Sequence, residues 1–284
     1  MRGRCRVLKQ RILTAAALGL PALALVAWGP NWAVLALVAL VLGLATWEWG
    51  GLVGLENPLA RGALVAAVVV PVVALGLAPV AGLHYLILGL VLLWWLVILL
   101  LLPFYRERET AAPASRRTLF AVAAIMTLVP AGMGLVWLHA LAPLLVVYLV
   151  VLVGLADTGA YFAGKAFGRN PLAPHISPGK TREGLLGGLL TVLAFAIVVA
   201  AVWGLEPMDA MVFLLLSVLI GLVSVVGDLF ESILKRQAGE KDSGSLLPGH
   251  GGILDRFDSM VAAAPVFLAG LLWLALIPAP PVAA

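Results

Sequence analysis

Residues 209–258 read DAMVFLLLSVLIGLVSVVGDLFESILKRQAGEKDSGSLLPGHGGILDRFD, a long apolar run followed by a strongly polar stretch. The run from 209 to about 233 is long enough to cross a bilayer as a helix, for which about 20 residues suffice. The polar stretch, 227–258, mixes acids, bases and glycines. Because 63% of the chain is hydrophobic and only 11% is charged, such a cluster is costly, and we interpret it as a functional site.

The rest of the chain resembles the apolar run in composition. Soluble proteins carry about 25% charged residues, far more than this chain has. A transmembrane β-barrel would show alternating segments of about ten residues, whereas this chain has continuous runs of Leu, Val and Ala. The sequence therefore predicts an all-α, polytopic integral membrane protein.

Nine transmembrane helices are predicted, and the first is interpreted as an uncleaved membrane helix after a basic tail. We expect a single membrane domain, 1–284, in which residues 1–150 are mostly apolar helices and residues 151–284 supply the catalytic helices and cytoplasmic loops. The predicted spans are 12–28, 32–54, 63–82, 84–102, 118–138, 141–164, 185–204, 209–233 and 259–278.

The distribution of lysine and arginine predicts the orientation. With the N-terminus in the cytoplasm, all 18 of these residues fall in cytoplasmic segments and the opposite side receives none, as the positive-inside rule requires. We therefore expect a cytoplasmic N-terminus, with every polar motif on the cytoplasmic face of the inner (cytoplasmic) membrane of the cell. The net charge of +4 does not indicate a nucleic-acid partner, because the cations are distributed by membrane side.

A polar stripe ends the apolar helix at 209–233. Ser224, Asp228, Glu231, Ser232 and Lys235 are spaced by four, three, one and three residues, so they lie along one helical face. Such a face is expected to contact protein or water and not lipid. The alternative is an Asp–Lys pair that merely ends the helix.

The loop after this helix is rich in glycine. Glycines let backbone amides approach an anion closely, and successive N–H groups form a nest for phosphate oxygens. Residues 248–252, PGHGG, are of this kind, with His250 available to donate. Because cations flank the turn, we predict a polyphosphate-binding loop. These cations are Lys235, Arg236, Lys241 and Arg256.

Asp255 and Asp258 follow the loop, three residues apart at the start of the last predicted helix. Acids in that position can simply complement the helix dipole. Together with Asp228, however, they suit Mg²⁺, which prefers carboxylate oxygens and is usually shared between one or two carboxylates and substrate phosphates. The pattern indicates divalent-metal phosphate chemistry without specifying the substrate.

A second polar block, residues 156–184, reads ADTGAYFAGKAFGRNPLAPHISPGKTREG. Asp157 and Lys165 fall on one helical face, and a proline-rich turn with hydroxyl and lysine side chains follows. The alternatives are an internal ion pair between Asp157 and Lys165 and helix capping by Ser177 or Thr181. The ligand-binding residues predicted in this block are Asp157, Lys165, Ser177, Lys180, Thr181 and Glu183.

The segment SILKRQAGEKDSGSLLPGHGGILDRFD, residues 232–258, closely resembles the signature of the phosphatidate cytidylyltransferase, or CDP-diacylglycerol synthase, family. In that pattern a Ser, Lys-Arg, Lys-Asp, a Gly-His-Gly-Gly turn and Asp-Arg-x-Asp come at these spacings. DTGAYFAGKAFG and ISPGKTREG in the second block are similar to other segments of the same family. The resemblance covers residues 157–184 and 224–258.

The resemblance implies a reaction of phospholipid biosynthesis in which CTP and phosphatidate give CDP-diacylglycerol and pyrophosphate, with Mg²⁺ required. The expected partners are CTP, phosphatidate and membrane lipids, and the family implies a homodimer. The residues agree with this chemistry, because charge builds on the transferred group and on the leaving pyrophosphate, where a metal and fixed cations stabilise it.

The resemblance also suggests residue roles. Asp228 and Asp255 are expected to hold the metal with Glu231, while Asp258 supports this ion or holds a second, monovalent or divalent, cation. The predicted catalytic residues are Asp228, Lys235, Arg236, Lys241, Asp242, His250, Asp255 and Arg256. The predicted substrate-binding residues are Asp157, Lys165, Ser177, Lys180, Thr181, Glu183, Ser224, Ser232, Gly251 and Gly252.

Two other functions fit parts of the pattern. A CTP-dependent polyprenol kinase, or a cytidylyltransferase for a different lipid phosphate, would share the metal and phosphate residues and differ in its products. A transporter would place charges at the membrane midplane, often within repeats. Here the charges lie at the predicted cytoplasmic ends of helices and no internal repeat is evident, which favours an enzyme.

Overall fold

The computed structural model of the chain describes residues 17, 19–77, 83–105, 114–246, 251–274 and 276. Eight helices in this part are long and apolar enough to cross a membrane, which confirms the predicted all-α, polytopic class. A shorter apolar helix, Gly19–Trp28, falls within the first predicted span, the rest of which lies outside the described residues. The total of nine spans and the cytoplasmic N-terminus stay predictions.

The observed helices match the predicted spans closely. α8 continues five residues beyond its predicted end at 233. The elements are α2 Asn31–Leu52, α3 Pro58–Leu77, α4 Leu83–Leu101, η1 Leu102–Phe104, α5 Ala114–Leu141, α6 Pro143–Phe167, β1 Pro171–Ala173, β2 Ser177–Thr181, α7 Arg182–Val202, α8 Pro207–Ala238, α9 Leu254–Phe257 and α10 Met260–Trp273.

Contacts within the chain divide it into two compact units. The first comprises Met1–Ala78, Thr110–Val147 and Leu234–Phe257, and the second comprises Pro79–Glu109, Tyr148–Ile233 and Asp258–Ala284. Each unit is therefore assembled from segments far apart in the sequence. The predicted single membrane domain and its division near residue 150 stay predictions.

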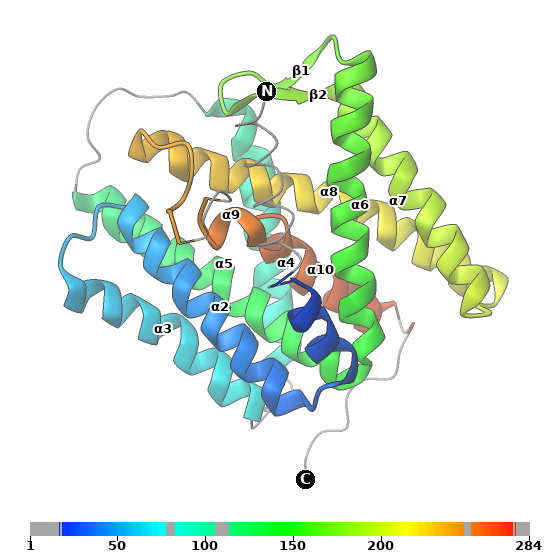
Figure 1. The fold of residues 1–284 in the computed structure, drawn as a ribbon, viewed down its shortest axis with the longest axis horizontal. Coiled ribbons are helices and arrows are strands. Elements are labelled where there is room, and N and C mark those ends of the chain that lie inside the picture. Colours follow the sequence, from blue (N-terminus) through cyan, green and yellow to red (C-terminus); the bar gives the residue numbers. More distant parts are fainter. Residues whose placement is uncertain are drawn as a thin grey trace. The chain divides into compact units, whose positions relative to one another are not determined.

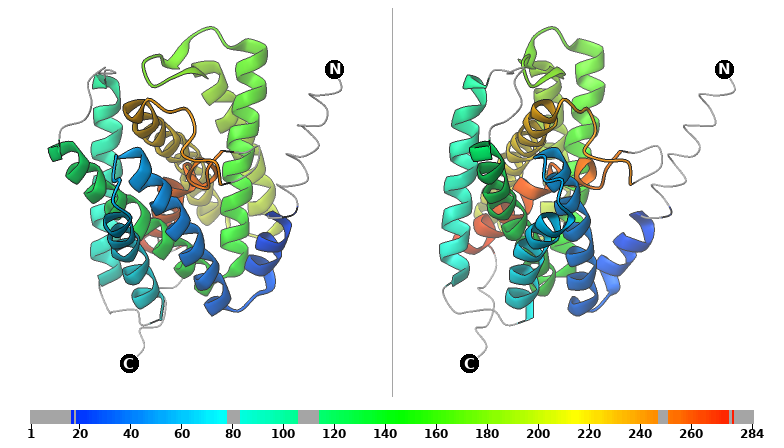
Figure 2. Two further views of the ribbon diagram at one scale, coloured as in Figure 1. Left: turned by 60° about the vertical axis from the view of Figure 1, so that its left-hand side comes forward. Right: turned by 90° about the vertical axis from the view of Figure 1, so that its left-hand side faces the viewer.

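In the first unit, α2, α3 and α5 lie side by side (Figure 1 and Figure 2). A glycine on α5 allows the close approach, because a Cβ at Gly132 would lie 3.0 Å from the Cγ atoms of Val72 on α3. The buried Trp49 indole of α2 donates a hydrogen bond to the carbonyl oxygen of Phe120 on α5, at 3.0 Å. Small residues and this hydrogen bond fix the three helices together.

In the second unit, α6 and α7 run side by side (Figure 1) and meet through small residues. A Cβ at Gly188 would lie 2.7 Å from the Ala156 carbonyl oxygen, and one at Gly184 would lie 2.9 Å from that of Ala160. Glycine and alanine four residues apart on both helices let membrane helices pack backbone to backbone.

The core of the second unit surrounds Tyr148 of α6. Its hydroxyl shares a 2.7 Å hydrogen bond with Ser217 of α8, so the buried polar atom is satisfied. Its ring centroid lies 5.3 Å from that of Phe195, 5.1 Å from that of Phe213 and 5.7 Å from that of Phe267. Aromatic packing of this kind joins α6, α7, α8 and α10.

Two local features differ from the sequence-based expectation. The proline-rich turn after α6 contains a short antiparallel hairpin, in which Pro171 pairs with Thr181 and Ala173 with Ser177. The last predicted helix is divided into α9 and α10. Asp255 therefore lies in α9 and Asp258 in the turn before α10, and the expectation that both begin one helix is wrong.

Candidate active site

The polar end of α8 carries the predicted stripe. Ser224 and Glu231 are buried, and the Ser224 hydroxyl donates to the carbonyl oxygen of Gly221 in its own helix, at 2.9 Å. The helix ends at Ala238. The next residue, Gly239, has a φ of 72°, and the Glu240 N–H donates to the Lys235 carbonyl oxygen at 2.9 Å. A left-handed glycine with this back-bond is a common helix C-cap.

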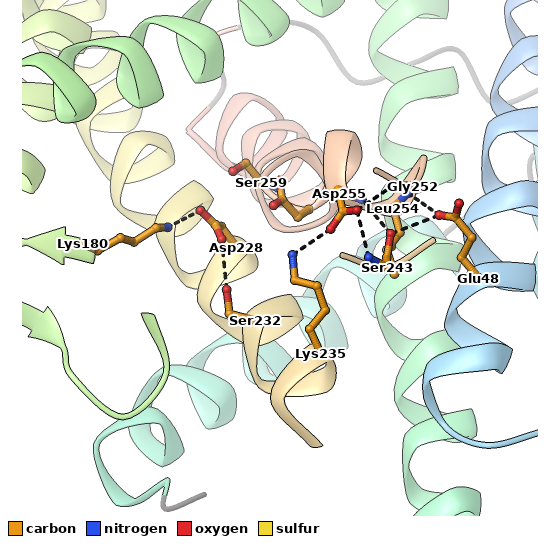
Figure 3. Close-up of polar contacts among 11 residues, drawn as sticks. Glu48, Lys180, Asp228, Ser232, Lys235, Ser243, Gly252, Leu254, Asp255 and Ser259 are labelled. Atoms are coloured by element: carbon orange, nitrogen blue, oxygen red, sulfur yellow. Dashed lines mark hydrogen bonds and ion pairs between the residues drawn. The ribbon is translucent and has the colours of Figure 1, made fainter. Parts of the chain in front are cut away.

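Asp228 lines an open cavity of about 430 Å³ in the second unit, between α6, α7, α8 and the hairpin, which is called the polar cavity here because four charged residues line it. One carboxylate oxygen forms an ion pair with the Lys180 ammonium on β2, and the other accepts from the Ser232 hydroxyl at 3.4 Å (Figure 3). The Lys180 and Asp228 side chains are 27% and 22% exposed. The alternative considered for the stripe was an Asp–Lys pair that merely ends the helix, whereas this pair joins α8 to the hairpin.

A second acid lines the cavity that holds this ion pair. Asp157 of α6 lines the same cavity, and its carboxylate interacts electrostatically with Asp228, Asp258 and Lys180. Carboxylates placed together repel one another, and a nearby cation relieves the repulsion.

Lys165 and Thr181 also line this cavity. The Lys165 Nζ lies 5.8 Å from the centroid of the Tyr161 ring one turn earlier on α6, a cation–π contact. The Thr181 hydroxyl accepts from the Gly184 N–H at 3.1 Å and is the N-cap of α7. Capping, the alternative foreseen for this residue, is confirmed, and it leaves the hydroxyl at the cavity wall.

Glu183 and Ser177 belong to the framework of the hairpin. The Glu183 carboxylate accepts from the backbone N–H groups of Arg169 and Asn170, at 3.1 and 3.2 Å, and from the Asn170 side-chain amide at 2.6 Å. Ser177 begins β2 opposite Ala173. Glu183 thereby ties the start of α7 to the segment that precedes the hairpin.

Asp258 is brought to α8 by a glycine. A Cβ at Gly227 would lie 2.5 Å from the Asp258 carbonyl oxygen and 3.1 Å from the Ala262 Cβ. The Asp258 carboxylate accepts from the following N–H, that of Ser259, at 2.6 Å. The backbone of Asp258 therefore packs on α8 one residue before Asp228.

Asp255, in the first unit, is held by several donors at once. Its Oδ1 accepts from the Lys235 ammonium at 2.8 Å, and its Oδ2 accepts from the backbone N–H groups of Ser243 and Gly252 at 2.9 and 2.8 Å. The Asp255 and Lys235 side chains are only 8% and 13% exposed. Charge-assisted hydrogen bonds to both oxygens fix this carboxylate in one orientation.

Two glycines of the loop lie against the Asp255 carboxylate. Gly251 has a φ of 80°, and a Cβ there would lie 2.7 Å from the Asp255 Oδ2. The Gly252 N–H, predicted to belong to a phosphate nest, donates to Asp255. Residues 247–250, including His250, lie outside the described residues, so the predicted role of the histidine stays a prediction.

Glu48 is a site residue that the sequence analysis did not select. It lies in α2, is 6% exposed, and its Oε2 accepts from the Leu254 N–H at 2.9 Å and from the Ser243 hydroxyl at 3.2 Å (Figure 3). The signal in the sequence is a single acid within an apolar helix, which is costly in a membrane protein and so points to function.

The remaining predicted cations among the described residues are Lys241, Arg236 and Arg256. A polar cavity of about 640 Å³ in the first unit is lined by the ends of α2 and α8, by Arg117 of α5 and by loop residues that include Lys241 and Asp242. Both of these loop residues are exposed. Arg236 is half-buried on α8 and Arg256 is exposed on α9.

An apolar cavity of about 590 Å³ lies in the second unit, lined by α4, η1, the hairpin, α7 and α8. Three of its lining residues, Leu172, Leu185 and Val225, also line the polar cavity at Asp228. Apolar and polar spaces thus share a wall. This arrangement suits a molecule with one charged end and one hydrocarbon end.

The predicted metal ligands are distributed over both units. Asp228, Glu231 and Asp258 belong to the second unit and Asp255 to the first. Within the described residues, no group of three or more His, Cys, Asp or Glu side chains is close enough to hold a metal ion. The prediction that these acids share one ion stays a prediction.

Comparison with known proteins decides the family. The model of the cytidylyltransferase family matches residues 9–274. The chain belongs to the cytidylyltransferase family. It is 45% identical over 273 residues to a phosphatidate cytidylyltransferase of Pseudomonas aeruginosa, an alignment that covers 95% of this chain and 98% of the relative.

Two further relatives support the assignment. A phosphatidate cytidylyltransferase of Haemophilus influenzae is 36% identical over 285 residues, covering 92% of this chain and 97% of the relative. One of Bacillus subtilis is 46% identical over 118 residues, covering 42% of this chain and 44% of the relative. The resemblance inferred from the sequence is confirmed, and this family member is a nucleotidyltransferase and a multi-pass membrane protein.

Proposed function

We propose that this enzyme transfers the cytidylyl group of CTP to phosphatidate, giving CDP-diacylglycerol and pyrophosphate in phospholipid biosynthesis. The observation that carries the proposal is the shared wall between the polar cavity at Asp228 and the apolar cavity beside it. Phosphatidate has a phosphate that suits the first and acyl chains that suit the second. The names of the full-length relatives support the same substrate.

The reaction needs no covalent intermediate with the enzyme. An oxygen of the phosphatidate phosphate attacks the α-phosphorus of CTP, a new P–O bond forms, and the bond from that phosphorus to the bridging oxygen breaks as pyrophosphate leaves. Lys165 and Lys180 line the polar cavity and are placed to neutralise phosphate charge. Lys235, Arg236, Lys241, His250 and Arg256 are proposed to hold the triphosphate or the lipid phosphate.

The acids of the second unit are candidate ligands for Mg²⁺. Asp157 interacts electrostatically with Asp228, Asp258 and Lys180, and carboxylate oxygens are the ligands that Mg²⁺ prefers. We propose that Asp228 and Asp258 hold the ion, and that Asp255 and Glu231 are further ligands as the family pattern suggests. When bound, Mg²⁺ would neutralise charge on the nucleotide phosphates.

The membrane arrangement completes the proposal. If the N-terminus is cytoplasmic, all 18 Lys and Arg residues lie on the cytoplasmic side, where they would attract CTP and anionic lipid headgroups. We therefore propose an active site at the cytoplasmic face of the inner membrane. A homodimer is proposed from the family resemblance alone.

The test is a reconstitution with purified protein in detergent, CTP, phosphatidate and Mg²⁺, each omitted in turn. Release of pyrophosphate together with CDP-diacylglycerol, only when all three are present, is the expected result. An Asp228→Asn variant is the matched control and should be nearly inactive. Formation of CDP with a phosphorylated lipid would identify a kinase instead, and the absence of turnover with any lipid phosphate would overturn the proposal.

A further inference from the structure

Glu48 has no part in the reaction outlined above, yet it is one of the most buried charged residues in the described chain. Taking a carboxylate out of water costs several kcal/mol unless hydrogen bonds compensate. Its Oε2 receives two of them, one from the Leu254 N–H and one from the Ser243 hydroxyl. Leu254 precedes Asp255 in the sequence, and Ser243 is hydrogen-bonded to Asp255.

Ser243 connects the two acids. Its hydroxyl donates to Glu48, and the same oxygen accepts from the backbone N–H of Asp255 at 3.3 Å. A hydroxyl has one hydrogen to donate. Because the Glu48 oxygen accepts that hydrogen, a lone pair of the Ser243 hydroxyl stays directed at Asp255, while the Ser243 N–H donates to the Asp255 carboxylate.

Two glycines make room for the Glu48 carboxyl group. A Cβ at Gly244 would lie 2.5 Å from its Oε1, and one at Gly252 would lie 2.7 Å from its Cδ. Oε1 is buried and has no hydrogen-bond partner within the described residues. A well-packed apolar side chain would join α2 to this loop at lower cost, so stability alone does not account for an acid here.

We propose that Glu48 is a positioning residue that sets the orientation of the Asp255 carboxylate. It acts through the Ser243 hydroxyl and through the Leu254 backbone, which together fix α9 and the loop before it. The inference rests on the proposed function in one respect, namely that Asp255 takes part in cytidylyl transfer. The link from Glu48 to Asp255 is a structural statement that is tested separately.

The activity test compares Glu48→Ala and Glu48→Gln with Trp49→Phe. Removing a residue that orients a catalytic or metal-binding group typically costs 10- to 100-fold, so Glu48→Ala should lower kcat by about that factor and raise the Mg²⁺ concentration at half-maximal rate. Glu48→Gln keeps an acceptor oxygen and should recover much of the loss. Trp49→Phe is the control for weakened α2 packing, because Trp49 is equally buried but bonds α5.

The structural test uses hydrogen exchange of the detergent-solubilised protein without substrates. The backbone amides of Ser243, Gly252 and Leu254 should exchange faster in Glu48→Ala and at the wild-type rate in Trp49→Phe. If Glu48→Ala does not fold, Ser243→Ala tests the same link, since it interrupts only the middle of the chain of hydrogen bonds. Faster exchange at Asp255 in that variant supports the proposal.

Unchanged exchange in the Glu48 and Ser243 variants overturns the inference, as does a loss of activity no larger than that of Trp49→Phe. Failure of the proposed function looks different: the wild-type protein would form no CDP-diacylglycerol while the exchange result still stood. A Ser243→Ala/Glu48→Ala double variant should lose little more activity than Glu48→Ala alone, because Glu48→Ala already interrupts the link through Ser243.

Discussion

Asp228 and Asp255 both pair with a lysine, but their surroundings are opposite. Asp255 is almost fully buried, receives three hydrogen bonds and has glycines shaped around it. Asp228 lines an open cavity, where it forms an ion pair with Lys180 and accepts one long hydrogen bond from Ser232. Two further acids lie near it. One carboxylate is held in place and the other is left able to exchange its partner.

The difference predicts different roles for the two carboxylates. A carboxylate whose two oxygens both accept hydrogen bonds acts as a structural anchor, so its removal should lower both stability and activity. A carboxylate among like charges gains from a new cation, so its removal should affect activity while leaving stability nearly unchanged. The four predictions below test this contrast.

Asp255→Asn should have the largest combined effect. Asp255→Asn breaks the buried ion pair with Lys235, and such losses cost about 3 kcal/mol. Activity should fall about 100-fold as well. Chemical denaturation in detergent and initial rates measure the two effects, and Lys235→Met/Asp255→Asn should recover part of the stability but none of the activity. A fully stable Asp255→Asn would end the description of this residue as an anchor.

Asp228→Asn should lower activity about 100-fold or more, a loss of roughly 3 kcal/mol in transition-state stabilisation. Its stability should change by less than about 1 kcal/mol, because the pair with Lys180 is partly exposed and one of three neighbouring acids is removed. The measurements are the same as for Asp255, with Ser232→Ala as a mild control. A large loss of stability would show that the two carboxylates do not differ.

Lys180→Met should act mainly on substrate affinity. Since the Lys180 side chain is 27% exposed, removing it should cost less than about 1 kcal/mol of stability, whereas the KM for CTP should rise about tenfold. Steady-state kinetics with varied CTP measure this, and Lys180→Arg, which keeps the charge, should be closer to wild type. An unchanged KM would argue that the lysine only neutralises Asp228.

The smallest predicted effect compares two left-handed glycines. Gly251→Ala and Gly239→Ala both force alanine into a positive φ, which costs about 1 kcal/mol. A Cβ at 251 would also press on the Asp255 carboxylate, whereas no atom of the described residues lies within 4 Å of one at 239. Only Gly251→Ala should therefore lower activity. Equal activity in both would show that Asp255 tolerates displacement.

Hydropathy was sufficient for the overall class, because each described helix of membrane-spanning length falls where an apolar run predicted it. The hairpin at 171–181 was missed because three- and five-residue strands leave no periodic signal. The division between α9 and α10 was missed for a similar reason, since Ser259 and its neighbours read as a continuing helix. Short interruptions depend on tertiary packing, here the approach of Asp258 to Gly227.

The candidate site was foreseeable in its residue types but not in its pairings. Spacing on α8 predicted that Asp228, Ser232 and Lys235 share a face, yet it could not show that Lys180 would reach Asp228 or that Lys235 would reach Asp255. Glu48 lies 206 residues from its partner Leu254, a distance over which sequence periodicity carries no information. Contacts of that range follow only from the fold.

The space that the Glu48 carboxyl group occupies has a consequence for how related sequences should differ. Positions 48, 244 and 252 compete for one volume, since a side chain on either glycine would overlap the acid. Relatives that lack an acid at position 48 should have room for alanine or serine at the other two positions, and relatives that keep it should not. In an alignment of relatives, the residue types at these three positions should therefore covary.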